Sequence, residues 1–124
     1  MSDTDCGTLD LTTMATQKVW EHHRSAFLSK NIDDIMADYT EDSLVATHDQ
    51  VNRGLAEIRL FFDIFIKTTD PVFWDVFKTQ AKMIAGPVAY LVWEAKPYVA
   101  MGTDTFVIQD NKILVQTITM LKKA

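Results

Sequence analysis

The spacing of hydrophobic residues divides the chain into a helical first half and a strand-rich second half. Between residues 13 and 29 apolar positions recur every three or four residues, which predicts a helix with one buried face. Asn31 is expected to cap a short second helix, because its side chain can accept from the free N–H groups at a helix start. A third helix is predicted to follow Gly54 and to end at Asp70-Pro71. Its inward face should consist of Leu55, Ile58, Phe61, Phe62, Phe65 and Ile66.

After Pro71 the apolar period changes to two, which is typical of β-strands. Asp110-Asn111 is predicted to form a two-residue hairpin turn, because both residues tolerate a positive φ. Helices first and strands later, without alternation, predict an α+β domain with an antiparallel sheet. Strands are expected over residues 44–48, 72–85, 88–96, 98–109 and 112–121.

The last two strands carry large apolar side chains on both faces. A sheet that helices cover on one side alone should have a polar second face. We therefore expect a second copy of the chain to cover the outer face, which makes a homodimer. On the strand over residues 98–109, one face is expected to carry Ala100, Phe106 and Ile108, and the other Val99, Met101 and Val107.

Length and composition narrow the possible functions. The 124 residues suit a single domain over residues 1–124, of which about the first ten are expected to form a flexible polar tail. A net charge of -5 argues against a nucleic-acid partner, and no apolar run is long enough to span a membrane. The lone Cys6 makes the cytoplasm the expected compartment. One cysteine, three dispersed histidines and four glycines give no zinc or nucleotide motif, so no metal or cofactor is expected.

Asp104 is the most unusual residue of the second half. It shares a strand face with Phe106 and Ile108 in the segment over residues 102–113. A carboxyl group on a buried apolar face is costly unless it has partners or a purpose. Asp104 is therefore the leading candidate for a functional residue.

The order of elements resembles the nuclear transport factor 2-like superfamily, and within it the ketosteroid isomerase-like and SnoaL-like branch. The segments that carry the resemblance are residues 31–43, 52–62 and 103–113. It implies a cone-shaped α+β barrel, in which three N-terminal helices pack on a curved antiparallel sheet around an apolar pocket. It also implies a dimer through the outer sheet face. The superfamily includes isomerases, cyclases, dehydratases and ligand binders, so the fold alone does not select a function.

The resemblance implies roles for three positions. Asp104 falls where the isomerases carry a protonated aspartic acid, and an apolar pocket would favour that neutral donor form. His23 falls where they carry a tyrosine, and a His23–Asp104 acid/base pair would instead favour an ionised Asp104. These two versions of the site exclude each other. Thr47 aligns with the base carboxylate and cannot abstract a carbon-bound proton, so steroid isomerisation by the standard mechanism is not expected.

Further residues are candidates for contact with a small hydrophobic molecule. His48 and Asp49 follow the short strand, where a bulge could turn one of them inward or leave both in solvent. Three functions stay open: acid/base chemistry such as isomerisation, dehydration or cyclisation, ligand binding without catalysis, or a scaffold that recruits another protein. The candidates for substrate binding are Trp20, Tyr39, Thr47, His48, Phe62 and Trp93, with Phe65 a further aromatic residue of the same kind.

Overall fold

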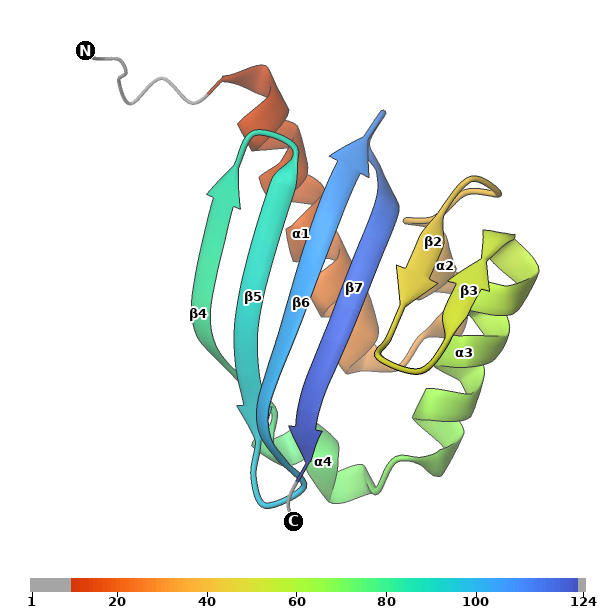
Figure 1. The fold of residues 1–124 in the computed structure, drawn as a ribbon, viewed down its shortest axis with the longest axis vertical. Coiled ribbons are helices and arrows are strands. Elements are labelled where there is room, and N and C mark those ends of the chain that lie inside the picture. Colours follow the sequence, from red (N-terminus) through yellow and green to blue (C-terminus); the bar gives the residue numbers. More distant parts are fainter. Residues whose placement is uncertain (1–9, 123–124) are drawn as a thin grey trace.

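The helices cover one face of a curved sheet, and the other face stays open (Figure 1). This computed structural model describes residues 10–122, so Cys6 and nearly all of the predicted tail lie outside the described residues. The helices are α1 (Leu11–Ser29), α2 (Ile32–Met36), α3 (Gly54–Thr68) and α4 (Pro71–Val76). The strands are β2 (Leu44–Ala46), β3 (Val51–Arg53), β4 (Lys78–Ala85), β5 (Val88–Ala95), β6 (Val99–Gln109) and β7 (Lys112–Lys122).

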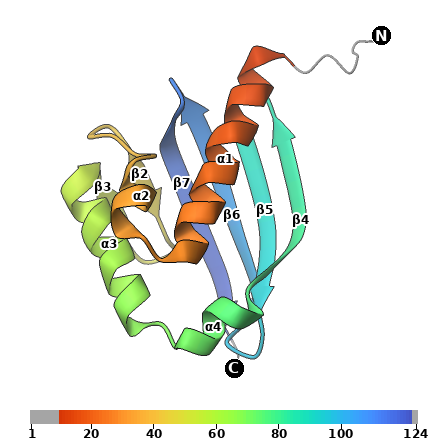
Figure 2. The ribbon, with the colours of Figure 1, turned by 180° about the vertical axis from the view of Figure 1, so that it is seen from behind.

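The first two helices begin where side chains cap them. Asp10 accepts a hydrogen bond from the backbone N–H of Thr13 at 2.6 Å, so α1 begins at Leu11, two residues before the predicted start. Asn31 accepts from the backbone N–H of Asp34 at 3.1 Å, which confirms the predicted cap of α2. Viewed from behind, α1, α3 and α4 lie on the same side of the sheet (Figure 2).

The predicted strand over residues 72–85 is wrong in its first part, because helix α4 occupies that segment. Asp70 caps this helix by accepting from the backbone N–H two residues further on, at 2.9 Å. A proline at the first helical position also favours a helix here, since its fixed φ suits the first turn. The helix buries Phe73, a position that strand alternation would bury as well, and the two patterns are therefore hard to separate.

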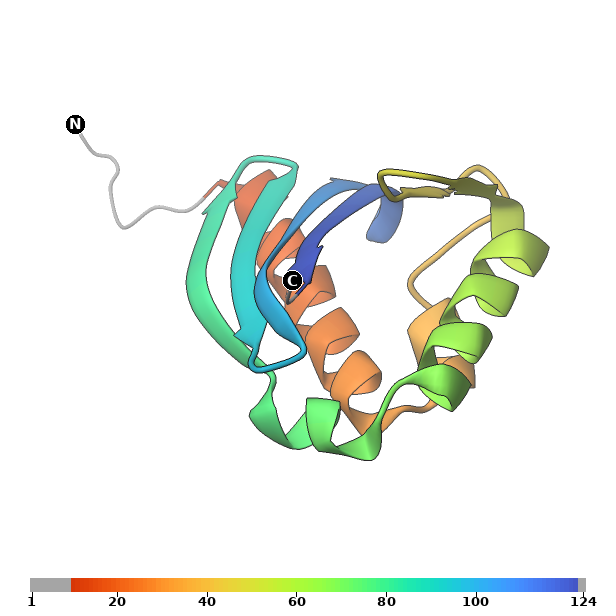
Figure 3. The same ribbon diagram turned by 60° about the horizontal axis from the view of Figure 1, so that its bottom comes forward.

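The sheet has the strand order β3-β2-β7-β6-β5-β4. Strands β4 to β7 form an antiparallel meander, and positive φ values of 53° at Asp110 and 62° at Asn111 confirm the predicted hairpin turn. Strand β2 pairs with β7 in parallel, and β3 extends the edge, two features that the sequence did not predict. The α+β class is confirmed, and Figure 3 shows the sheet curling around the helices as a cone requires.

An irregularity near the start of β6 changes which side chains face the core. The register with β7 shifts between Val99 and Met101, so Val99 is buried and Ala100 is exposed, the reverse of the predicted faces. Further along the strand Phe106 and Ile108 are buried, as predicted. Because alternation resumes after the bulge, Asp104, two residues before Phe106, also faces the helices.

The outer face of the sheet carries large apolar side chains from four neighbouring strands. Their exposed fractions are 67% at Met83, 39% at Tyr90, 48% at Met101 and 62% at Leu121. The expected apolar outer face is therefore present, whereas the homodimer stays a prediction. Within residues 10–122 no helix is both long and apolar enough to cross a membrane.

Candidate functional site

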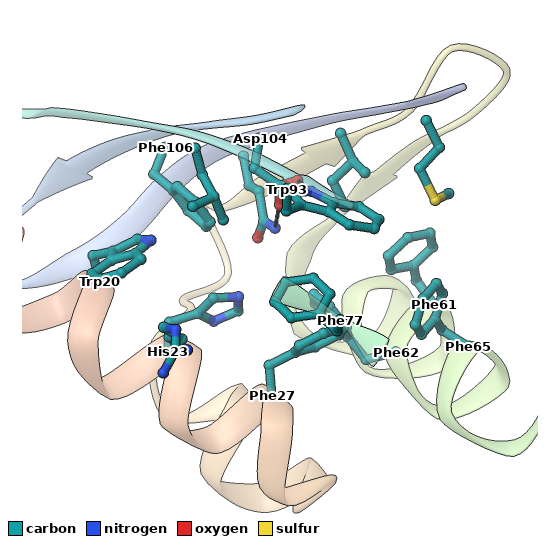
Figure 4. Close-up of a pocket in the computed structure, with 15 residues that line it drawn as sticks. Trp20, His23, Phe27, Phe61, Phe62, Phe65, Phe77, Trp93, Asp104 and Phe106 are labelled. Atoms are coloured by element: carbon teal, nitrogen blue, oxygen red, sulfur yellow. Dashed lines mark hydrogen bonds between the residues drawn. The ribbon is translucent and has the colours of Figure 1, made fainter. Parts of the chain in front are cut away.

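A cavity of about 60 Å³ lies between the sheet and helices α1 and α3. Figure 4 shows its side chains converging from the two layers. Eight of the fifteen lining residues are aromatic, and the polar ones that reach the interior come from α1, β6 and β7. The aromatic residues are Trp20, Phe27, Phe61, Phe62, Phe65, Phe77, Trp93 and Phe106.

Asp104 lies at the sheet side of this cavity and is only 8% exposed. Its Oδ1 accepts a hydrogen bond from the indole Nε1 of Trp93 at 2.9 Å, and its Oδ2 accepts from Nε2 of Gln116 at 2.9 Å. The two donors stand on β5 and β7, the strands on either side of β6. Both carboxyl oxygens therefore act as acceptors, which suits the ionised form of Asp104.

Gly102 allows the indole of Trp93 to lie where it does. The two residues pair across β5 and β6, and a Cβ at Gly102 would lie 2.2 Å from Cε2 of Trp93. No ordinary contact is that short, so any side chain at this position must displace the indole. Trp93 can donate to Asp104 because the residue beneath its ring has no side chain.

Gln116 connects Asp104 to Tyr39 in the buried interior. The Tyr39 hydroxyl donates to Oε1 of Gln116, and the amide nitrogen of Gln116 donates to Asp104. Burial raises the pKa of Tyr39 well above its usual value, and the charges of Asp104 and Asp38 add to the effect. Tyr39 therefore stays protonated, and because its hydroxyl donates to Oε1 of Gln116, the amide nitrogen of Gln116 is the atom that faces Asp104.

The pKa of Asp104 is raised above its ordinary value, chiefly because burial disfavours the charged form. The hydrogen bonds from Trp93 and Gln116 act in the opposite direction, as does the charge of His23. Burial alone would favour the neutral donor predicted from the resemblance. In the hydrogen bonds from Trp93 and Gln116, however, Asp104 only accepts, which matches an ionised Asp104 beside His23.

His23 points into the cavity from α1 and is 5% exposed (Figure 4). Its ring packs edge-on against Phe106 and Tyr39, with centroid distances of 5.4 Å and 5.8 Å. Its Nδ1 is buried, has no hydrogen-bond partner among residues 10–122, and lies 3.8 Å from Oδ2 of Asp38. His23 and Asp104 thus line one cavity as expected, but the hydrogen bonds to Asp104 come from Trp93 and Gln116 rather than from His23.

The aromatic residues that were predicted to bind a ligand lie at the cavity or directly behind it. Trp20, Phe62, Phe65 and Trp93 line the cavity, and Tyr39 stands behind it and reaches it through Gln116. These aromatic residues also form part of the hydrophobic core, so packing alone already accounts for their burial.

Thr47 and His48 lie outside the cavity, contrary to the prediction. Strand β2 ends at Ala46, and the backbone N–H of Thr47 donates to the carbonyl of Gln50 at 2.9 Å, which turns the chain into β3. The Thr47 hydroxyl donates to Asp49 at 2.8 Å within this turn. The side chains of His48 and Asp49 are 70% and 71% exposed, so neither enters the site.

His22 and Asp38 were not predicted to take part in the site. Nδ1 of His22 lies 2.8 Å from both carboxyl oxygens of Asp38, and its Nε2 lies 3.0 Å from Oδ1 of Asp34. The hydrogen bond with Asp38 is the main reason that the pKa of His22 is raised. The only sequence signal was the pair of adjacent histidines on α1, since contacts sixteen residues apart depend on how α2 packs. In the part of the chain that the structure describes, no three His, Cys, Asp or Glu side chains are grouped to hold a metal ion.

An open groove of about 640 Å³ adjoins the cavity at the end where α4 and the β5–β6 turn meet. Phe65 and Met120 line both spaces. Pockets for small molecules commonly measure about 300–1,000 Å³, so the inner cavity alone is too small for most ligands. A ligand that entered from the groove would therefore pass Phe65 and Met120.

No protein-family model matches this chain, and no curated protein sequence matches it. Solved structures do resemble it. An NTF2-like protein of unknown function from Mesorhizobium loti has 14% identity and a TM-score of 0.75, over 92% of this chain and 97% of that protein. A SnoaL-like protein of unknown function from Burkholderia thailandensis has 12% identity and a TM-score of 0.71, over 91% and 99%. A Sinorhizobium meliloti protein provisionally named a polyketide cyclase has 14% identity and a TM-score of 0.70, over 86% and 97%.

Identities this low show a shared fold rather than shared chemistry. The matches nevertheless cover nearly the whole of this chain and of the compared chains, so the likeness extends over the helices and the sheet together. This chain has the cone-shaped α+β fold of the nuclear transport factor 2-like and SnoaL-like proteins, as the order of its elements predicted.

Proposed function

We propose that the cavity receives a small hydrophobic molecule with one hydrogen-bonding oxygen, and that His23 and Asp104 carry out acid/base chemistry on it. The observation that supports this most is the presence of two buried titratable side chains, His23 and Asp104, in a cavity whose wall is mostly aromatic. Titratable groups placed in apolar pockets are enriched at functional sites. The reaction is of the isomerase, dehydratase or cyclase type, and one similar structure carries a provisional polyketide cyclase name.

His23 is the residue that exchanges the proton. Because its Nδ1 is sealed in the interior, Nε2 is the ring nitrogen that a ligand can reach. Nε2 takes a proton from a carbon next to the ligand oxygen and becomes part of an imidazolium cation. The proton then returns to another carbon in an isomerisation, or joins a hydroxyl that leaves as water in a dehydration. In an aldol-type cyclisation the carbanion attacks a second carbonyl carbon of the ligand, and the proton goes to the oxygen of that carbonyl.

Asp104 supplies a fixed negative charge beside the histidine. The hydrogen bonds from Trp93 and Gln116 hold both of its oxygens, so the carboxylate cannot turn away. In an interior that excludes water, a charge held in place stabilises the imidazolium more than it would in solution. The aromatic wall gives the site its preference for flat or apolar molecules.

Substitutions in the cavity test this proposal. In Asp104→Asn and His23→Ala, turnover or ligand binding should fall at least tenfold, while the circular dichroism spectrum stays that of the wild type. His48→Ala is the matched control, because it removes a histidine whose side chain is 70% exposed and lies outside the cavity. Unchanged activity in both cavity variants would remove the proposal.

A binder without catalysis is the second candidate. It is favoured by Thr47, which stands where the related isomerases carry their base and is turned into an exposed loop here. Native mass spectrometry of the protein after incubation with cell extract separates the two candidates. A retained and chemically unmodified ligand supports binding alone, whereas turnover of that ligand refutes it.

We also propose that the outer face of the sheet forms a homodimer in the cytoplasm. Met83 and Tyr90 pair across β4 and β5, and Met101 and Leu121 pair across β6 and β7, so this face of the single chain leaves large apolar side chains exposed on four adjacent strands. Exposed apolar groups gathered on one face are candidates for an interaction site. A monomer in solution, or a complex with a different protein through this face, would favour the scaffold function instead.

A further inference from the structure

Asp38 is a buried carboxyl group that stands between two histidines of α1. It follows helix α2, and its side chain is 9% exposed. The backbone holds it firmly, because its carbonyl accepts from the N–H of Ile113 on β7 at 2.7 Å. Its carboxylate lies 2.8 Å from Nδ1 of His22 and 3.8 Å from Nδ1 of His23. Asp38 does not line the cavity itself, so any effect it has on the cavity must pass through His23.

The surroundings of His23 leave Asp38 as the natural acceptor for its Nδ1 proton. That nitrogen is buried without a hydrogen-bond partner among residues 10–122, and Asp38 is the acid nearest to it. A carboxylate oxygen accepts more than one hydrogen bond, so the contact with His22 does not exhaust it. A shift of about 1 Å would bring the 3.8 Å separation into hydrogen-bond range, and sites without a ligand are often this loose.

His22 stands between two carboxyl groups. Both nitrogens of its ring face carboxyl oxygens, one from Asp38 and one from Asp34. This arrangement favours the doubly protonated imidazolium of His22, which donates to Asp38. Other ionisable groups near His23 are Asp104 on β6, Arg24 on α1 and the hydroxyl of Tyr39, which donates to Gln116.

We propose that Asp38 is the positioning residue of the site: it holds the ring proton of His23 on Nδ1 and leaves Nε2 free to accept from a molecule in the cavity. This rests on the proposed function of the cavity and adds the residue that sets the tautomer of its histidine. In this tautomer His23 is a base toward the ligand. With the proton on Nε2 instead, the same side chain would only be a donor.

Nitrogen-15 NMR of the histidine rings in the full chain without ligand tests the tautomer directly. At about pH 8, where an ordinary imidazole is neutral, the His23 resonances of the wild type should be those of a protonated Nδ1 and an unprotonated Nε2. In Asp38→Asn the fraction with the proton on Nε2 should rise at least threefold, because an amide oxygen is a weaker acceptor than a carboxylate. Asp34→Asn is the matched control, which removes an acid from His22 alone and should leave His23 unchanged.

If His23 of the wild type carries its proton on Nε2, the proposed role of Asp38 is refuted. This result comes from the wild-type protein alone and does not depend on whether a variant folds. An unchanged tautomer in a folded Asp38→Asn protein would overturn that role equally. Because the tautomer is measured in the protein without ligand, its result is independent of whether the cavity binds a ligand or carries out a reaction. Loss of turnover in His23→Ala without a tautomer preference in the wild type would refute only the positioning role. A clear preference without any turnover or ligand would refute only the chemistry.

Discussion

Replacing Gly102 by alanine tests whether the position of Trp93 depends on the missing side chain beneath it. A Cβ at this position would stand 2.2 Å from Cε2 and 2.3 Å from Cζ2 of the indole, far inside van der Waals contact. The indole is 5% exposed and packs against Phe73 and Phe77, so it cannot swing into solvent. The ring or the strand must shift, and the hydrogen bond from Nε1 to Asp104 must lengthen or break.

The expected destabilisation follows from these two effects. Overpacking a core typically costs about 1–3 kcal/mol, and losing a hydrogen bond to a charged group costs about 1.5–3 kcal/mol. We therefore expect the free energy of unfolding to fall by about 2.5–6 kcal/mol in Gly102→Ala, since both effects arise at this contact. Urea denaturation followed by circular dichroism measures it, with the wild type as reference.

A double-mutant cycle shows whether the indole is the cause. In Trp93→Ala, where no ring occupies the space, adding Gly102→Ala should cost less than about 1 kcal/mol. If Gly102→Ala alone lay within about 0.5 kcal/mol of the wild type, the close approach of the ring to β6 would be refuted. Equal costs in both backgrounds would refute the role of Trp93 in particular.

Three further predictions concern other parts of the molecule. The pKa of His22 is raised in the folded state. Its contribution to stability is therefore complete at a pH below its unfolded pKa and is lost as the pH rises through its folded pKa. The His22→Ala variant should lose stability at low pH, and its free energy of unfolding should depend less on pH between about 5 and 8. A profile parallel to the wild type would contradict this. Met101→Lys places a charge in the outer sheet face, and light scattering should show a folded monomer in place of a dimer, whereas a persisting dimer would exclude this face. Phe65→Ala removes a ring shared by the cavity and the groove, so bound ligand should dissociate at least tenfold faster, and an unchanged rate would place the entrance elsewhere.

The elements with strong periodicity could be predicted from the sequence. Helix α1 depends on the spacing of apolar residues, and the hairpin at Asp110-Asn111 depends on backbone preference, and both are visible in the local sequence. Asp104 could be found because a carboxyl group on an apolar strand face is costly without partners. Helix α4 could not be told from a strand, because Phe73 fits a buried position in a strand and in a short helix alike.

The partners of the site residues depend on tertiary structure that spacing does not contain. Gln116 meets Asp104 through the register of β6 and β7, which pairs Gln116 with Phe106 on the inward face. Asp38 meets the histidines of α1 through the packing of α2, sixteen residues away in the chain. Thr47 and His48 were misplaced for a similar reason, since the strand before them ends at Ala46 and the turn that follows carries them outward.

In the proposed site an apolar molecule with a hydrogen-bonding oxygen binds between His23 and Asp104. The most direct test is a titration of the nitrogen-15-labelled protein with 2-naphthol, followed through the indole N–H resonances. Trp93 and Trp20 line the cavity, whereas Trp74 does not and serves as the internal control. We expect the Trp93 and Trp20 resonances to shift saturably and Trp74 to shift less, with weaker binding in Asp104→Asn. Resonances of Trp93 and Trp20 that stay unchanged at saturating 2-naphthol would contradict the claim.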